Sequence, residues 1–224
     1  MLNYLKTGAL VSIIALTATP AWAGNYAEVA RSSLIINAGY TKEKNACTSP
    51  WYTAVMSGTG CSEGHQAYRL AYDYQFTPTW GMEVSYGDFG NAQGHGTVLM
   101  TGVPYQSNWS LKSGGWAFAG TGTLHLGDFV SFFGKIGGAR PEFQEKLNTS
   151  NNYTGVTINN IGIVNSAKSS LTYGVGCQID ISSSFAIRAQ FENFGTYDVY
   201  GQYGIPGTAK VTLTMASAGL VLKF

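Results

Sequence analysis

Apolar and polar residues alternate one by one along several stretches of this chain. In residues 66–76 the apolar positions are Tyr68, Leu70, Tyr72, Tyr74 and Phe76. In residues 210–224 they are Ala216, Ala218, Leu220, Leu222 and Phe224. A period of two is the period of a β-strand, so each stretch is predicted to be a strand with one apolar face and one mixed face.

Eight stretches of this kind are predicted along the chain. They are residues 33–40, 66–76, 80–87, 116–126, 129–139, 170–181, 185–194 and 210–224. The long connections between them are residues 41–65, 90–115, 140–169 and 195–209, and each alternates with a short turn. An even number of strands with short turns at one end and long loops at the other is typical of bacterial outer-membrane barrels. We therefore predict an all-β fold, an eight-stranded antiparallel up-and-down transmembrane β-barrel with both termini on the short-turn side.

The alternation alone does not say which face of the strands lies inside the barrel. A soluble barrel that binds an apolar ligand would turn its large apolar residues inward. The charged face of this chain, however, also carries small residues such as Gly81, Gly174 and Gly176, which suit the crowded interior of an eight-stranded barrel. The other face carries Tyr, Trp and Phe near the strand ends, as the aromatic girdles of membrane barrels do. These features favour an apolar exterior in contact with lipid.

The composition agrees with an exported membrane barrel. Charged residues make up 11% of the 224 residues and the formal net charge is +1, so nothing indicates a nucleic-acid partner. The N-terminus has a basic Lys6, a short apolar run at residues 9–16 and the sequence Ala-Trp-Ala at residues 21–23. This order predicts a signal peptide at residues 1–23 and a barrel domain at residues 24–224. A retained anchor is less favoured, because the run is shorter than the roughly 20 residues that a helical span needs.

The charged residues on the predicted inner face are the main candidates for a site. They are Arg69, Asp73, Glu83, Lys135, Asp180, Arg188 and Glu192. Charges removed from water need partners or retained water, so we expect ion pairs across the lumen. One interpretation is a plug that fills the barrel, and the other is a gate in a narrow pore for small solutes. The plug is favoured because eight strands leave little room for water.

Cysteines and histidines add two further expectations. Cys47 and Cys61 fall in the first long loop, where an oxidising compartment favours a disulfide that would contribute roughly 3 kcal/mol. Cys177 is predicted on the lipid-facing side as a small apolar residue. His65, His95 and His125 are scattered and form no metal-binding motif, so we expect no metal and no cofactor. A lipid A-modifying enzyme would need a Ser and a His in hydrogen-bond reach at the outer rim, and the sequence fixes no such pair.

Aromatic residues in the predicted outer loops indicate surface contact. They are Trp51, Tyr52, Tyr105, Trp109, Tyr153, Tyr200 and Tyr203, set among Gly, Asn and Ser. Aromatics among small polar residues suit contact with surfaces or glycans, and equally suit a cap on the barrel mouth.

Three long runs of this sequence resemble a known family. YRLAYDYQFTPTWGMEVSYGDFG (68–90), GWAFAGTGTLHLGDFVSFFGKIGGAR (115–140) and YGVGCQIDISSSFAIRAQFENFG (173–195) are similar to the OmpA-like eight-stranded outer-membrane barrels. The ending ASAGLVLKF resembles that family's assembly signal, with Leu220, Leu222 and Phe224 at its alternate positions. Glu83 and Arg188 match the positions of a pair that meets across the lumen in the family.

The resemblance implies a location and a set of partners. The location is the bacterial outer membrane, and the partners are its lipid and lipopolysaccharide, the barrel-assembly machinery and a surface ligand held by the outer loops. It implies the barrel domain alone, without the peptidoglycan-binding domain of larger members. We expect a monomeric, non-enzymatic protein that serves envelope integrity and surface contact. A narrow channel, a lipid A-modifying enzyme and a soluble barrel are the alternatives.

Overall fold

A computed structural model describes residues 31–48, 57–100, 103–127, 129–150, 157–164, 169–200 and 208–224. The predicted signal peptide, residues 1–23, lies outside the described residues. The described residues form ten strands: β1 (Arg31–Lys44), β2 (Ser57–Ser62), β3 (Gly64–Gln75), β4 (Trp80–Met100), β5 (Val103–Leu126), β6 (Val130–Ser150), β7 (Thr157–Val164), β8 (Ser170–Asp180), β9 (Phe185–Tyr200) and β10 (Thr208–Lys223). No helix among them is long and apolar enough to cross a membrane.

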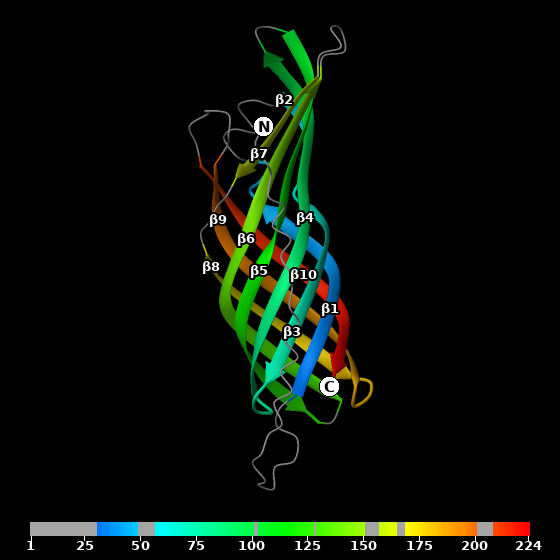
Figure 1. The fold of residues 1–224 in the computed structure, drawn as a ribbon. Helices are drawn as coiled ribbons and strands as arrows, with labels where there is room; N and C mark the ends of the chain where they lie inside the picture. The colour runs from blue at the N-terminus through cyan, green and yellow to red at the C-terminus, as the bar shows by residue number, and fades with distance from the viewer. Residues whose placement is uncertain are drawn as a thin grey trace, which may run out of the picture.

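Eight of these strands close into a ring (Figure 1). Their order around the ring is β1, β3, β4, β5, β6, β8, β9 and β10, and every neighbouring pair is antiparallel. The first and last strands close it, with Ser33 opposite Lys223. The predicted eight-stranded up-and-down barrel is therefore confirmed, and β2 and β7 are additional strands beside the ring.

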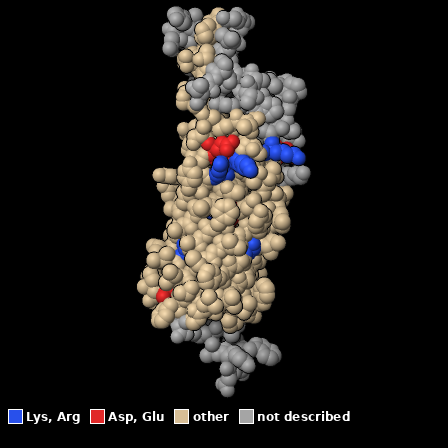
Figure 2. Space-filling model, turned by 180° about the vertical axis from the view of Figure 1, so that it is seen from behind, with Lys and Arg blue, Asp and Glu red and all other residues tan. Residues whose placement is uncertain are grey.

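The apolar faces of the strands point outward. Leu220 is 57% exposed, whereas Glu83 is 1% exposed. Tyr72 and Val84 are likewise exposed, and Arg188 is buried. On the face that Figure 2 shows, charged side chains are sparse and gather toward one end of the barrel. This orientation contradicts the soluble alternative, because an apolar exterior around a charged interior suits hydrocarbon and not water.

Exposed aromatic residues form a girdle near each end of the apolar surface. The outer girdle consists of Tyr40, Tyr68, Tyr86, Trp116 and Tyr173, and the turn-side girdle of Phe76, Trp80, Phe129, Phe185 and Phe224. Within the outer girdle the rings of Tyr86 and Trp116 lie 4.9 Å apart between centroids. Such rings favour the two membrane–water interfaces, so the girdles mark the limits of the membrane-spanning part.

Strands β4, β5 and β6 continue well beyond the outer girdle (Figure 1). There β2 pairs with β4, and β7 pairs with β6, so the order β2-β4-β5-β6-β7 makes a five-stranded sheet. We call this sheet the outer extension. It comprises β2, β7 and the parts of β4, β5 and β6 that lie at residues 91–100, 103–112 and 142–150. The prediction that residues 90–115 and 140–169 are loops is therefore wrong for most of their length.

Candidate functional site

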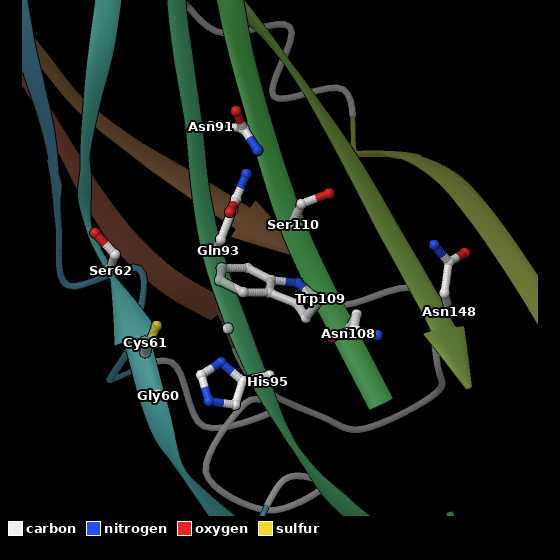
Figure 3. A pocket seen from close by; sticks show the side chains of 11 residues that line it. Gly60, Cys61, Ser62, Asn91, Gln93, His95, Asn108, Trp109, Ser110 and Asn148 are labelled. Atoms are coloured by element: carbon white, nitrogen blue, oxygen red, sulfur yellow. The ribbon is translucent and has the colours of Figure 1, made fainter. Parts of the chain in front are cut away.

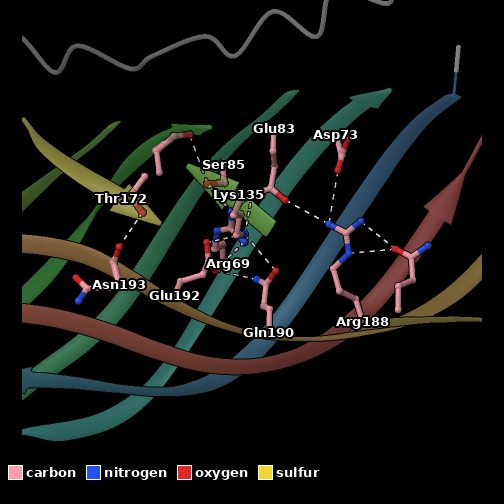
Figure 4. Close-up of polar contacts among 12 residues, drawn as sticks. Arg69, Asp73, Glu83, Ser85, Lys135, Thr172, Arg188, Gln190, Glu192 and Asn193 are labelled. Carbon is pink, nitrogen blue, oxygen red and sulfur yellow. Dashed lines mark hydrogen bonds and ion pairs between the residues drawn. The ribbon is translucent and has the colours of Figure 1, made fainter. Parts of the chain in front are cut away.

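Six of the seven predicted lumen charges meet inside the barrel (Figure 4). At the centre is Glu83, which forms ion pairs with Arg69, with Lys135 (Oε1 to Nζ, 3.0 Å) and with Arg188 (Oε2 to Nη1, 3.3 Å). Glu83 lies on β4 and Arg188 on β9, four strands away in an eight-stranded ring. The predicted pair between these two residues is present, and it crosses the lumen from one wall to the opposite one.

A second carboxylate completes the cluster. The Glu192 side chain lies 2.6 Å from Lys135 Nζ and 3.1 Å from Arg69 Nη1. Gln190 donates a hydrogen bond to Glu192 (2.8 Å) and accepts one from Lys135 (3.1 Å). Asp73 lies 3.6 Å from Arg188 Nη1. We call Arg69, Asp73, Glu83, Lys135, Arg188 and Glu192 the charge network. It holds three cations and three carboxylates, so no net charge is buried in it.

Asp180, the seventh predicted charge, lies outside this network near the turn-side end. Its carboxylate pairs with Lys223 Nζ (2.6 Å) and accepts a hydrogen bond from Gln178 (2.9 Å). Gln178 in turn accepts two hydrogen bonds from Arg188, at 2.9 and 3.1 Å. The roles of Gln178, Gln190 and Lys223 are not among the predictions from the sequence, although all three share the inward-facing parity of their strands.

Some buried polar atoms in the described lumen have no hydrogen-bonded partner. Both side-chain polar atoms of Asn37 are of this kind, as are Asp73 Oδ1, Thr121 Oγ1 and Ser217 Oγ. Buried polar groups of this sort are usually satisfied by internal water. The membrane-spanning part of the interior is therefore mainly polar, apart from a small buried apolar cluster of Ile35, Ala71, Ala186 and Val221, and it suits a few bound waters beside the charge network.

Beyond the charge network the interior becomes apolar. One cluster of buried residues, which we call the apolar plug, consists of Ala46, Ala67, Phe89, Ala92, Trp109, Leu111, Ala117, Ala139, Phe143, Phe194, Tyr197, Val211, Leu213 and Met215. The rings of Phe89 on β4 and Phe194 on β9 lie 4.6 Å apart between centroids, although these strands are on opposite walls. The outer end of the lumen is therefore filled by side chains.

A buried carboxyl lies at the edge of this plug. Glu43 follows the girdle residue Tyr40 on β1, so it lies outside the membrane-spanning part. It accepts hydrogen bonds from the Ser113 hydroxyl and from the Ala92 backbone N–H (3.0 Å). Burial raises the pKa of Glu43 to about 7, with a smaller contribution from the nearby Glu63 carboxylate, and the two hydrogen bonds oppose this shift. Glu43 thereby ties β1 to β4 and β5 from inside the barrel.

The predicted disulfide between Cys47 and Cys61 is present, with Cα atoms 5.9 Å apart. It joins the segment after β1 to β2, and so fixes one edge of the outer extension. Cys177 is a free thiol, half-buried among the outward-facing positions of β8, as predicted.

The three histidines lie on separate parts of the fold. His65 is on β3, His95 is exposed on the outer extension and His125 is exposed at the turn-side end of β5. None of their side chains has a hydrogen-bonded partner among the described residues. The described residues also contain no group of His, Cys, Asp and Glu that would hold a metal ion.

The aromatic residues that were predicted to make surface contacts do not share one environment. Trp51, Tyr52, Tyr153 and Tyr203 lie outside the described residues, and the side chain of Tyr200 is not described. Tyr105 is half-buried on the outer extension. For Trp109 the contact interpretation is wrong, because its side chain is 2% exposed, and its place in the apolar plug fits the alternative of a cap on the barrel mouth. It points inward because β5 continues through the predicted loop.

The outward face of the outer extension carries a polar hollow of about 480 Å³ (Figure 3). Its lining comes from four strands: residues 60–62 of β2, 91 and 93–95 of β4, 108–110 of β5 and Asn148 of β6. Amide side chains are prominent in it, namely Asn91, Gln93, Asn108 and Asn148. The hollow is not predictable from the alternation, because all four segments fall in predicted loops.

A filled lumen, an apolar exterior and two aromatic girdles define the class of this protein as an eight-stranded transmembrane β-barrel. The OmpA-like transmembrane domain family matches residues 36–224. The chain belongs to this family, and it is a protein of the bacterial outer membrane. No curated protein sequence matches the chain.

Several solved structures of outer-membrane proteins are similar to the chain. The attachment invasion locus protein Ail of Yersinia pestis is 18% identical, with 88% of this chain and 100% of that chain covered and a TM-score of 0.46. Neisserial surface protein A is 11% identical, with 86% and 97% covered and a TM-score of 0.44. OprG of Pseudomonas aeruginosa is 12% identical, with 86% and 96% covered and a TM-score of 0.43.

Proposed function

We propose that this protein is a closed barrel that supports the integrity of the outer membrane and presents its outer extension for contact with other surfaces, including adhesion. The observation that carries the proposal is the extension itself. Eight strands already close the ring, so the additional paired length of β4, β5 and β6 is not needed for closure. The disulfide and the apolar plug both brace this extra sheet. An ordered sheet that stands beyond the membrane suits recognition better than transport.

The filled lumen supports the closed state. Two layers span it from wall to wall, the Glu83–Arg188 ion pair at 3.3 Å and the Phe89–Phe194 contact at 4.6 Å. An ion in transit would have to displace both layers. A solute that enters from the outer side would meet apolar side chains first, which disfavour any hydrated ion.

Surface contact is tested by shortening the extension. In the test variant, an Asn-Gly turn replaces residues 96–107, so that the His95–Asn108 pair becomes the last pair of the β4–β5 hairpin. Heat-modifiable migration on a gel should show that the variant still folds. We expect proteoliposomes with the wild-type protein to attach to host-cell or matrix-coated surfaces, and those with the variant to lose most of this attachment. Equal attachment by the two would overturn the proposal.

A narrow channel is the second candidate, and the unpartnered atoms of Asn37, Thr121 and Ser217 favour it because they imply internal water. Planar-bilayer recordings of the wild type, Glu83→Ala and Glu142→Ala test it. The Glu142 side chain is exposed on the outer extension, so its substitution is the matched control. We expect no stepwise current from any of the three. Current that changes in Glu83→Ala but not in Glu142→Ala would favour the channel.

We propose no catalytic role. In support, the three histidines lie on three different strands and none has a serine hydroxyl as hydrogen-bonded partner among the described residues. Mass spectra of lipid A from cells with and without the protein should be identical. A new or missing acyl chain in the presence of the protein would instead indicate a lipid-modifying enzyme.

We also propose that Leu220, Leu222 and Phe224 serve as the signal for the assembly machinery. Leu220 and Phe224 are exposed toward the membrane and Leu222 is half-buried. Phe224→Ser should lower the amount inserted in cells while leaving folding into detergent micelles unchanged. Equal insertion in cells would contradict this role.

A further inference from the structure

We propose that the polar hollow on the outer extension is a binding site for an uncharged, hydroxyl-rich ligand, a neutral saccharide unit of a surface glycan. The inference rests on the proposed contact function and names the chemistry of its ligand. It concerns the four-strand hollow of Figure 3, which lies beyond the outer girdle and faces away from the barrel interior.

The strand register brings the lining side chains to one face of the sheet. Ser62, Gln93 and Ser110 are directly opposite one another across β2, β4 and β5. In the adjacent row Gly60, His95, Asn108 and Asn148 are directly opposite one another across β2, β4, β5 and β6. Residues opposite in an antiparallel ladder point to the same side. The two rows therefore form one continuous polar surface, held by backbone pairing and not by loops.

The chemistry of this surface matches a neutral polyol. Amide side chains each offer a donor and an acceptor group, and the Ser62 and Ser110 hydroxyls do the same. Saccharide hydroxyls need this mixture of donors and acceptors. No carboxylate, ammonium or guanidinium lines the hollow among the described residues. The lining itself thus matches an uncharged ligand, and the two lysines on the same face of the sheet, Lys112 opposite Asn91 and Lys146 opposite Ser110, lie outside it. The volume of the hollow is in the range of small-molecule sites.

The donors and acceptors are also available. The amides of Gln93, Asn108 and Asn148 have no hydrogen-bonded partner among the described residues, and all three side chains are exposed. A ligand would therefore replace water at these groups without breaking a hydrogen bond to another described residue. Because the backbone is already fixed in a sheet, little further ordering is needed for binding.

The floor and one wall of the hollow are rigid. Trp109 lies in the floor, and its side chain is packed in the apolar plug on the other side of the sheet. Cys61 lines the β2 side, and its disulfide to Cys47 holds that strand in place. At Gly60 a Cβ atom would lie 1.9 Å from His95 Cε1, so the imidazole occupies space that any other residue would fill. His95 keeps its position over β2 only because residue 60 is glycine.

Two matched double variants test the site in the full-length chain reconstituted in lipid nanodiscs. Gln93→Ala with Asn108→Ala removes two amides from the hollow. Gln106→Ala with Gln144→Ala removes two exposed amides of the outer extension that do not line it. Heat-modifiable migration establishes that both fold. The probe is an array of neutral oligosaccharides of hexose and N-acetylhexosamine units, printed beside sulfated and sialylated ones.

We expect binding to neutral oligosaccharides, weakened about tenfold or more in the hollow variant and less than twofold in the control. Gly60→Ala should weaken binding as well, because the added methyl group displaces His95. The inference is overturned if no neutral oligosaccharide binds, if the two double variants weaken binding equally, or if only charged glycans bind.

The same proteins in the attachment assay separate this inference from the proposed function. Attachment that is lost in the hollow variant, together with saccharide binding, supports both. Attachment that persists without any saccharide binding overturns the saccharide site and still supports the contact function. Saccharide binding by a protein that mediates no attachment supports the saccharide site and overturns the contact function.

Discussion

The interior of this barrel has two regions of opposite chemistry, and a single strand passes through both. On β10 the inward-facing residues level with the charge network are Ser217 and Gly219, whereas those beyond the outer girdle are Val211, Leu213 and Met215; Val221, nearer the turns, also faces inward. The outward-facing residues change in the opposite sense, from Ala218 and Leu220 to Lys210 and Thr212. The medium outside the wall explains the exchange. Where the wall faces hydrocarbon, polar groups gather inside, and where it faces water, an apolar core forms inside.

The two regions also hold the barrel together by different interactions. The charge network gains from ion pairs but costs desolvation of six charged groups, so its net contribution depends on every partner being present. The apolar plug gains stability from burial and packing, which do not depend on any single partner residue. Substitutions in the two regions are therefore expected to differ in size and in their dependence on pH and salt.

The largest effect is expected for Glu83→Ala. Loss of Glu83 removes the shared partner of Arg69, Lys135 and Arg188 and leaves buried positive charge unbalanced. Breaking a buried pair in this way costs about 3–5 kcal/mol. Urea unfolding in detergent micelles, followed by tryptophan fluorescence, measures the change. Glu142→Ala removes the same group from an exposed site and should change the free energy of unfolding by less than about 0.5 kcal/mol. Equal effects would mean that water, and not Glu83, balances the cations.

The next effect compares two leucines of the same strand. Leu213 is 0% exposed in the apolar plug, whereas Leu220 is 57% exposed toward the membrane. Leu213→Ala should cost about 3 kcal/mol, because it removes buried methyl groups and leaves a cavity. Leu220→Ala leaves no cavity, since lipid or detergent fills the space, and should cost about 1 kcal/mol from the same unfolding measurement. A larger loss at Leu220 would show that the plug is not packed like a protein core.

The sequence predicted one region well and missed the other, for a reason visible in the backbone. Strict alternation holds through the membrane-spanning part, and the predicted strands there are confirmed. It fails at Gly90 and Gly195, where φ is +79° and +101°. Near these positions the strand register shifts, between Asp88 and Asn91 and between Leu213 and Thr214. A bulge adds a residue, so the alternation changes phase while the pairing continues.

The predicted strands at residues 80–87 and 185–194 stop beside these bulges, which is why the alternation predicts loops where the outer extension lies. The hollow was hidden for the same reason, because its amides become neighbours only through pairing across β2, β4, β5 and β6. The Cys47–Cys61 disulfide was predictable, because the strand pattern places both cysteines in one outer segment and an exported protein meets an oxidising compartment. The Glu83–Arg188 pair was predictable from the family resemblance. Phe143 and Tyr197 of the plug lie in predicted loops, so alternation gave no indication that they are buried.

The buried carboxyl of the plug provides a pH test of the boundary between the two regions. The pKa of Glu43 is about 7 in the folded protein against an ordinary value of 4.5, so the folded state binds more protons between these limits. Its contribution to stability is therefore fully present below about pH 4.5 and is lost as the pH rises to about 7, by up to about 3 kcal/mol.

Glu43→Gln should remove this dependence. The measured quantity is the difference in the free energy of unfolding between wild type and variant across pH 4 to 8, because this difference cancels titration elsewhere in the barrel. This difference should shift in favour of the variant as the pH rises from 4.5 to 7, and it should stay constant above pH 7. A flat difference would mean that Glu43 stays ionised when folded and that water reaches the edge of the plug.

The smallest effect is expected for an ion pair on the water-facing wall. Asp88 and Lys112 form a pair of 2.9 Å, with side chains 49% and 53% exposed, just beyond the outer girdle. A double-mutant cycle with Asp88→Asn and Lys112→Met should give a coupling of about 0.5 kcal/mol. Because the Debye length falls to about 3 Å at 1 M salt, the coupling should then disappear. A coupling that survives high salt would mean that this pair is shielded from water, and that the interface lies farther out than the aromatic girdle. The same cycle on Lys135 and Glu192 should be several times larger and insensitive to salt, since no counter-ion reaches a pair enclosed by the barrel wall.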